Sequence, residues 1–150
     1  GPLEHMVREA ALRDPRIRYL GFPSDEELLA LYSQADVLVN PHSVSHTSAR
    51  YLFPSKLIEY LATGTPVVST CSTPGVAENY GNIASVMKTD SPVELAEQIL
   101  RLARMTSSQR RTLGAIARNF VLEHKTWRTQ ADRIAEFITR IVVIPRSGTS

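Results

Sequence analysis

The segment from Phe53 to Thr70 constrains the fold most, because one run of residues contains a helix start, a helix stop and a strand. Pro54 suits a first helical turn, where the missing N–H of proline would have no partner anyway. Apolar side chains at i,i+4 spacing then predict one buried helix face, made of Leu57, Leu61, Ile58 and Ala62. Gly64 fits the left-handed residue that ends a helix, and Val67–Thr70 reads as a buried strand.

Two charged residues lie on this predicted helix, Lys56 in its first turn and Glu59 one turn later. A lysine there opposes the helix dipole unless an anion lies nearby. The free N–H groups of a helix N-terminus, together with an ammonium, are suited to bind phosphate. The alternative is an exposed i,i+3 ion pair with little effect on stability. The spacing alone leaves both interpretations open.

Short apolar runs alternate with helical patterns through the first half of the chain. We expect a helix end at 7–13, strands at 17–20, 36–40 and 83–86, a helix after the capping box Ser24–Glu27, and a short helix at 76–80. Such alternation predicts an α/β fold, a mostly parallel sheet flanked by helices. Ligands bind at the carboxyl ends of such strands, so the site is expected in the loops after Leu20, Asn40, Thr70 and Val86.

The second half is predicted to be helical, with helices starting near Ser91, Ser108 and Thr126. The side chains expected to face inward are Leu95, Ile99 and Leu102 in the first, Leu113, Ile116, Ala117 and Phe120 in the second, and Trp127, Ile134, Phe137, Ile138 and Ile141 in the third. Residues 1–6 resemble a cleavage and cloning remnant, residues 7–144 read as one domain, and residues 145–150 are expected to be a disordered tail.

Composition excludes several classes of protein. The net charge of +2 is small and scattered, which argues against nucleic-acid binding. No apolar run reaches membrane-spanning length, and no signal peptide is present, so we expect a cytoplasmic protein. The single cysteine, Cys71, excludes an internal disulfide and reads as a small strand-end residue. No histidine, cysteine and carboxylate cluster has metal-ligand spacing.

The run P-S-K-L-x-E-Y-L-A-x-G-x-P-V-V, from Pro54 to Val68, resembles the donor-site segment of the GT-B glycosyltransferases, specifically the large retaining group often called family 4. Further similar pieces follow in the same order: Ile17–Phe22, Leu31–Pro41, Gly75 with Glu78, and Trp127. The resemblance covers roughly Ile17 to Ile141. It implies part of a Rossmann-like, donor-binding C-terminal domain, with a final helix that packs back across the domain.

The resemblance also implies roles for particular residues. Glu59 matches the glutamate that holds the ribose hydroxyls of a nucleotide sugar, while Ser55 and Lys56 would face the pyrophosphate. Gly21 and Phe22 match the turn beside the nucleobase. The implied reaction is retaining hexosyl transfer from a nucleoside-diphosphate sugar to a glycan or lipid-linked acceptor, as in polysaccharide biosynthesis, without a metal or other cofactor.

Two features depart from the family pattern. The family has two glutamates separated by seven residues, but Tyr51 stands where the first is expected. His46, Arg50 and Tyr51 are the candidates to contact the donor sugar instead, in a loop longer than usual. The resemblance also implies that the opening β-α-β of the domain and an N-terminal acceptor domain lie upstream of Val7. We therefore expect no sugar transfer by this chain alone, and any peripheral contact with the inner membrane face to come mostly from the missing half.

Two alternatives remain. The first is a nucleotide-sugar 2-epimerase, which shares the architecture but would need carboxylates and a histidine facing the sugar. The second is a non-catalytic nucleotide-sugar-binding module, supported by Tyr51 in place of the glutamate.

Overall fold

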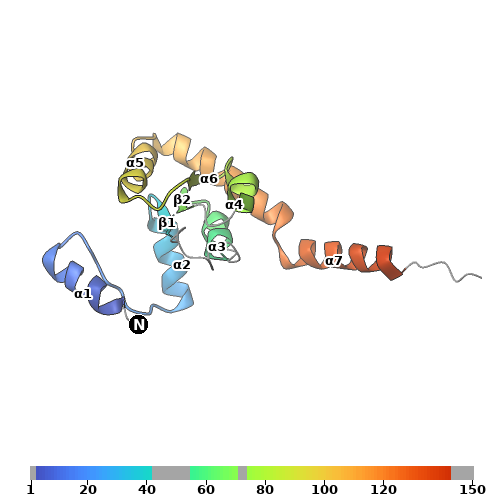
Figure 1. The fold of residues 1–150 in the computed structure, drawn as a ribbon, viewed down its shortest axis with the longest axis horizontal. Helices are drawn as coiled ribbons and strands as arrows, with labels where there is room; N and C mark the ends of the chain where they lie inside the picture. Colours follow the sequence, from blue (N-terminus) through green and yellow to red (C-terminus); the bar gives the residue numbers. More distant parts are fainter. Residues whose placement is uncertain (1–2, 42–54, 71–73, 143–150) are drawn as a thin grey trace, which may run out of the picture. The chain divides into compact units, whose positions relative to one another are not determined.

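The computed structural model describes residues 3–41, 55–70 and 74–142. Two compact units divide the chain, residues 1–31 and residues 32–150. The second unit contains the sheet and most of the helices (Figure 1).

The first unit contains helix α1 (Glu4–Arg13) and most of α2 (Asp25–Gln34). The guanidinium of Arg8 pairs with Glu4 at 2.9 Å and lies over the Tyr19 ring, 4.4 Å from its centroid. The predicted capping box is confirmed, since Glu27 N–H donates to Ser24 Oγ at 3.3 Å and Ser24 N–H donates to Glu27 Oε2 at 2.8 Å. Both hydrogen bonds satisfy donors that a helix start leaves unpaired.

The strand predicted at 17–20 is wrong. Residues 17–20 have no regular secondary structure, and Ile17 and Leu20 are 41% and 49% exposed. Four extended residues are a strand only when a neighbouring strand pairs their backbone groups, and the alternating apolar pattern carries no information about that neighbour.

The second unit confirms the predicted parallel α/β arrangement of a Rossmann-like domain. Its described residues form a three-stranded parallel sheet in the order β1-β2-β3, where β1 is Leu38–Asn40, β2 is Val67–Thr70 and β3 is Ser85–Met87. Asn40 is in register with Ser69, and Thr70 with Met87. Every residue of the central strand β2 is buried, as an apolar run between helices predicts.

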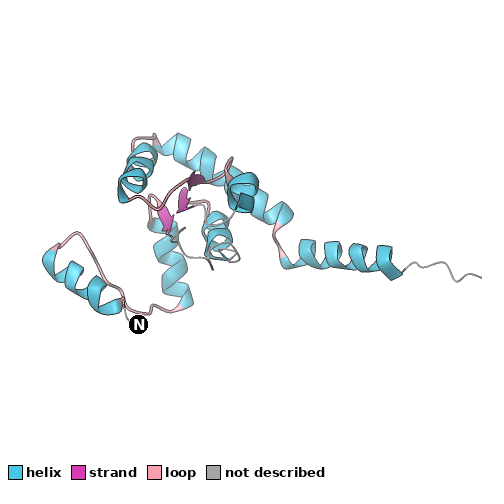
Figure 2. Ribbon diagram, viewed as in Figure 1, coloured by secondary structure: helices cyan, strands magenta, loops and turns pink. Residues whose placement is uncertain are grey.

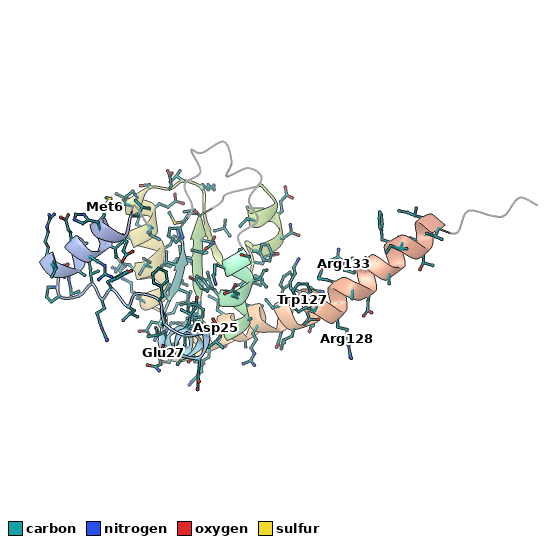
Figure 3. The ribbon with its side chains drawn as sticks, turned by 90° about the horizontal axis from the view of Figure 1, so that it is seen from below. Met6, Asp25, Glu27, Trp127, Arg128 and Arg133 are labelled. Atoms are coloured by element: carbon teal, nitrogen blue, oxygen red, sulfur yellow. The ribbon has the colours of Figure 1, made fainter. Side chains whose placement is uncertain are left out.

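Helices account for most of the described second unit (Figure 2). They are α3 (Ser55–Thr63), α4 (Pro74–Tyr80), α5 (Pro92–Ala103), α6 (Ser107–His124) and α7 (Trp127–Val142). Helix α3 lies on one side of the sheet and α5 on the other in both Figure 1 and Figure 3. Ser91 caps α5, and Thr106 with Gln109 forms a capping box on α6, which therefore starts close to the predicted position.

The core on the α5 side of the sheet is built around Val68, Met87 and Leu102, each at most 1% exposed. Partly buried side chains surround them: Val37, Leu95, Ile99, Met105 and Leu113. Side chains alternate along a strand, so Val68 and Thr70 of β2 lie on the same sheet face. Met87 of β3 is in register with Thr70, so it lies on that face too. The predicted inward residues of α5 are thus confirmed.

The end of α3 meets the middle of α6 through two glycines. Gly64 has φ +78°, which confirms the left-handed helix stop, and its carbonyl oxygen lies against Gly114. A Cβ added to Gly114 would lie 1.6 Å from that oxygen. Ala117, one turn further along α6, is buried as predicted. The prediction that Ile116 faces inward is wrong, since this side chain is 52% exposed.

The predicted packing of α7 is also wrong, because none of its residues is buried. The expected inward side chains are all more than half exposed: Trp127 92%, Ile134 59%, Phe137 64%, Ile138 52% and Ile141 55%. The corner between α6 and α7 is held by Gln130 Nε2 donating to the His124 carbonyl oxygen at 2.6 Å. Helical periodicity identifies an apolar face, but it does not show which element covers that face.

Glu94 gives the first prediction. Its carboxylate accepts hydrogen bonds from the Thr89 hydroxyl and from the backbone N–H groups of Lys88 and Thr89, at 3.1 and 3.2 Å. These bonds, the Thr89 hydroxyl above all, hold the pKa of Glu94 below its ordinary value. A carboxylate whose pKa is lowered by folding stabilises the folded state at pH values above its ordinary pKa. That stabilisation is lost as the pH falls through the lowered pKa of the folded state.

We therefore expect Glu94→Gln to lower the urea midpoint at neutral pH, because it removes the charge but keeps an acceptor oxygen. The difference from the unmodified chain should shrink as pH falls below the ordinary glutamate pKa, because Glu94 itself then becomes protonated. Urea unfolding at several pH values measures this difference. A gap that stays constant from neutral to acid pH would contradict the assignment.

Candidate functional site

The amino end of α3 lies at the carboxyl edge of the sheet. This follows from the topology, since β1 and β2 are parallel neighbours and α3 is the helix between them in the chain. A helix that connects two parallel strands runs back from the carboxyl end of the first to the amino end of the second. Its first turn is therefore at the edge where ligands bind in such sheets.

Helix α3 is anchored by one face and exposed on the other. Leu57 and Leu61 are 0% exposed, which confirms the predicted apolar face. Ser55, Lys56 and Glu59 are exposed. The first turn of α3 contains no acidic side chain. The first N–H groups of a helix have no partner within the helix, and together with the positive dipole end they favour an anion.

Lys56 and Glu59 form an ion pair on the exposed face of α3. The distance from Lys56 Nζ to Glu59 Oε2 is 2.7 Å, and the two side chains are 52% and 48% exposed. The hydrogen bond to Glu59 raises the pKa of Lys56 above its ordinary value. The ammonium therefore stays charged at neutral pH, and it loses its charge as pH rises through that raised pKa. An ammonium has three donors, so one bond to Glu59 leaves it able to bind an anion.

Two tyrosines pack together near the carboxyl end of α3. The rings of Tyr32 and Tyr60 meet edge to face, with centroids 4.9 Å apart, and burial raises the pKa of Tyr60. Thr65 Oγ1 donates to the Tyr32 carbonyl oxygen at 2.9 Å, and Thr63 Oγ1 donates to the Tyr60 carbonyl oxygen at 2.7 Å. These contacts hold the carboxyl end of α3 against the end of α2.

A buried polar pair joins β1 and β2 at the same edge. Asn40 and Ser69 are 5% and 0% exposed, and Asn40 Nδ2 donates to Ser69 Oγ at 3.1 Å. A buried carboxamide without such a partner would be costly. Sequence reasoning placed a loop after Asn40 but gave neither residue a role. The available signal was an asparagine in the last position of an otherwise apolar strand.

A family model described as "Glycosyl transferases group 1" matches residues 1–105 of the chain. The match includes the sheet and the whole of α3, and covers well over half of the sequence. The chain belongs to the group 1 glycosyltransferases. No match is found among curated proteins.

Membership in the group 1 glycosyltransferases makes this a glycosyltransferase domain, and implies a nucleotide-sugar donor and an acceptor in general terms. Among the described residues, no helix is long and apolar enough to cross a bilayer. Within residues 3–41, 55–70 and 74–142, no three histidine, cysteine, aspartate or glutamate side chains come together as a metal site.

The predicted site residues of this glycosyltransferase are found in different parts of the chain. Ser55, Lys56 and Glu59 share the first turns of α3. Gly21 and Phe22 belong to the first unit, where Gly21 has φ +68° and Phe22 is 91% exposed. The predicted donor-sugar residues His46, Arg50 and Tyr51 lie outside the described residues, as do Cys71 and the tail at 145–150.

A cavity of about 200 Å³ lies at the other edge of the sheet. Residues just before β1 and β2 line it, together with the start of α6: Asp36, Gly64, Thr65, Ser107, Arg110 and Arg111. Arg110 pairs with Asp36 there at 3.5 Å, and also donates to the carbonyl oxygen of Ala103 at 3.2 Å. The amino ends of the strands are not the ligand-binding edge of a parallel sheet. The cavity is therefore separate from the α3 site.

Proposed function

We propose that this chain binds the nucleoside diphosphate part of a sugar donor at the amino end of α3, as the donor-binding domain of a retaining, family 4-type GT-B glycosyltransferase. One observation carries the proposal: an ammonium and a carboxylate stand 2.7 Å apart on the exposed side of a helix that begins at the carboxyl edge of the sheet. Membership in the group 1 glycosyltransferases supports it.

Each residue of the α3 site has a separate part in this proposal. The Glu59 carboxylate accepts hydrogen bonds from the two ribose hydroxyls. The backbone N–H groups at Ser55 and Lys56, with the Lys56 ammonium, face the pyrophosphate. Negative charge grows on the phosphate as the sugar leaves, so donors already directed at it stabilise the transition state. The Lys56–Glu59 bond keeps the ammonium near the helix start before the donor arrives.

The test of this proposal is nucleotide binding by a Glu59→Ala variant. Loss of the two ribose hydrogen bonds should weaken binding about tenfold or more. Calorimetric titration of UDP, GDP and ADP into the unmodified chain and into the variant measures the effect, and shows which base is preferred. Because Glu59 is about half exposed, we expect the variant to keep the thermal unfolding temperature of the unmodified chain.

Glu97→Ala is the matched control, since it removes an exposed glutamate from α5 on the other side of the sheet. Its nucleotide affinity should be that of the unmodified chain. If the Glu59→Ala variant binds UDP, GDP and ADP as tightly as the unmodified chain does, Lys56 and Glu59 are only a surface ion pair.

A further inference from the structure

The cavity at the amino ends of the strands contains a guanidinium group that the fold holds in place. Arg110, near the start of α6, donates through Nη1 to the carbonyl oxygens of Ala103 and Met105, at 3.2 and 2.5 Å. These two carbonyl groups lie at the end of α5 and in the turn that follows it. The Arg110 side chain is only 22% exposed. A guanidinium has more N–H donors than these two bonds use, so Arg110 can still bind an anion in the cavity.

A second guanidinium lines the same cavity, and only one carboxylate opposes the two. Arg111 is exposed, and in the part of the chain that the structure describes no hydrogen bond or ion pair engages its side chain. Asp36 Oδ1 lies 3.5 Å from Arg110 Nη2, and the Asp36 side chain is 80% exposed. A contact of this length in water is weak, so an anion in the cavity can compete with it.

The rest of the cavity is suited to the same kind of ligand. Ser107, which also lines it, adds a hydroxyl group and is the first residue of α6. The first turn of α6 contains no acidic side chain, so the helix dipole adds to the field of the two arginines. The volume of about 200 Å³ is many times the space of about 10–15 Å³ that one water molecule needs. The cavity can therefore hold a group of several heavy atoms.

We propose that this cavity binds the phosphate group of a small phosphate monoester. Guanidinium groups bind phosphate oxygens through pairs of N–H donors. A phosphate monoester carries a charge of about −1.5 to −2 at neutral pH, which suits the excess of positive charge in the lining. The cavity is at the amino ends of the strands, whereas α3 begins at their carboxyl ends. The ligand is therefore distinct from the sugar donor, and the inference does not depend on the proposed function.

The alternative is that Arg110 only ties α6 to the residue before β1. That role explains the contact with Asp36, but it gives no part to Arg111 and needs no cavity. Side chains that serve packing alone usually leave few voids larger than a water molecule around them. A nucleic acid would need a broad basic surface rather than two arginines in a small cavity.

The test is titration of inorganic phosphate into the isotope-labelled chain, followed through its backbone amide resonances by nuclear magnetic resonance. The signals of Gly64, Thr65 and Ser107, which line the cavity, should shift as phosphate binds. Sodium chloride at the same ionic strength should not reproduce these shifts. Glycerol phosphate should bind at least as tightly, because the cavity has room beyond the phosphate group. Signals of Ser55 and Lys56 report separately on the start of α3.

Three variants separate a phosphate site from a structural ion pair. Arg111→Gln should weaken phosphate binding about fivefold or more, because it removes an uncommitted charge-assisted donor. Asp36→Asn should strengthen binding about two- to fivefold, since it removes the carboxylate that competes for Arg110. A purely structural pair predicts no such gain. Arg133→Gln is the matched control, because it removes an exposed arginine from α7, and its phosphate affinity should equal that of the unmodified chain.

Shifts confined to Ser55 and Lys56 would overturn this inference and leave the proposed donor site intact. Chloride that moves the signals of the cavity residues as phosphate does would also overturn it, because the site would then select no phosphate. Equal phosphate affinity of the Arg111→Gln variant and the unmodified chain would do the same. Thermal unfolding should show that Arg111→Gln and Asp36→Asn remain folded, since both replaced side chains are exposed.

Discussion

Replacing Gly114 by alanine is expected to destabilise the chain by about 3 kcal/mol or more, a large effect for one added methyl group. The new Cβ would lie 1.6 Å from the carbonyl oxygen of Gly64 and 2.6 Å from its carbonyl carbon. Both are backbone atoms, so no side chain can rotate away to make room. Either α6 must move off α3, or Gly64 must give up the left-handed conformation that ends α3.

Urea unfolding of Gly114→Ala measures this effect, with Gly75→Ala as the control. Gly75 lies in α4, and a Cβ there would meet only the Asn79 side chain, at 3.7 Å. That change should be neutral or stabilise the chain by up to about 1 kcal/mol, because alanine is the better helix former. If Gly114→Ala unfolds at the same urea concentration as the unmodified chain, the close contact between α3 and α6 is wrong.

Truncating Leu57 to alanine is expected to cost about 2–5 kcal/mol. Leu57 is 0% exposed and lies on the buried side of α3, in the same turn as Lys56. The loss combines the transfer free energy of the removed carbons with the cavity that they leave. Because this side chain anchors the first turn of α3, the change should also weaken nucleotide binding if α3 is the donor site.

Thermal and urea unfolding measure the stability change, and Leu100→Ala is the control. Leu100 lies in α5 and is 52% exposed, so its truncation should change the free energy of unfolding by only about 0.5 kcal/mol. Similar losses for the two leucines would contradict the burial of Leu57. A stable Leu57→Ala variant with unchanged nucleotide affinity would separate α3 from the binding site.

The local signals of the chain predicted α3, Gly64 and β2 correctly, because they depend on residues close together in sequence. A proline, an i,i+4 apolar stripe, a glycine and a β-branched run each favour one backbone conformation before any tertiary contact forms. The capping box at Ser24 is equally local and is confirmed. The strand predicted at 17–20 failed because it needed a partner from elsewhere in the chain.

Part of the candidate site was likewise predictable from the sequence, and part was not. The sequence placed Ser55, Lys56 and Glu59 on one helix, and the parallel topology places the start of that helix at the ligand-binding edge. Spacing allowed an ion pair between Lys56 and Glu59, and the distance of 2.7 Å shows that it forms. The buried bond between Asn40 and Ser69 joins residues 29 positions apart, so no local pattern could reveal it.

The sequence by itself determined the order of helices and strands in the second unit, the helix that carries Lys56 and Glu59, and the left-handed turn at Gly64. These features follow from backbone preference and apolar periodicity within a few residues. Tertiary structure alone revealed the contact of Gly114 with Gly64, the polar pair at the edge of the sheet and the uncovered face of α7. Each depends on which distant segments meet, and their packing is set by the shape and burial of the whole unit.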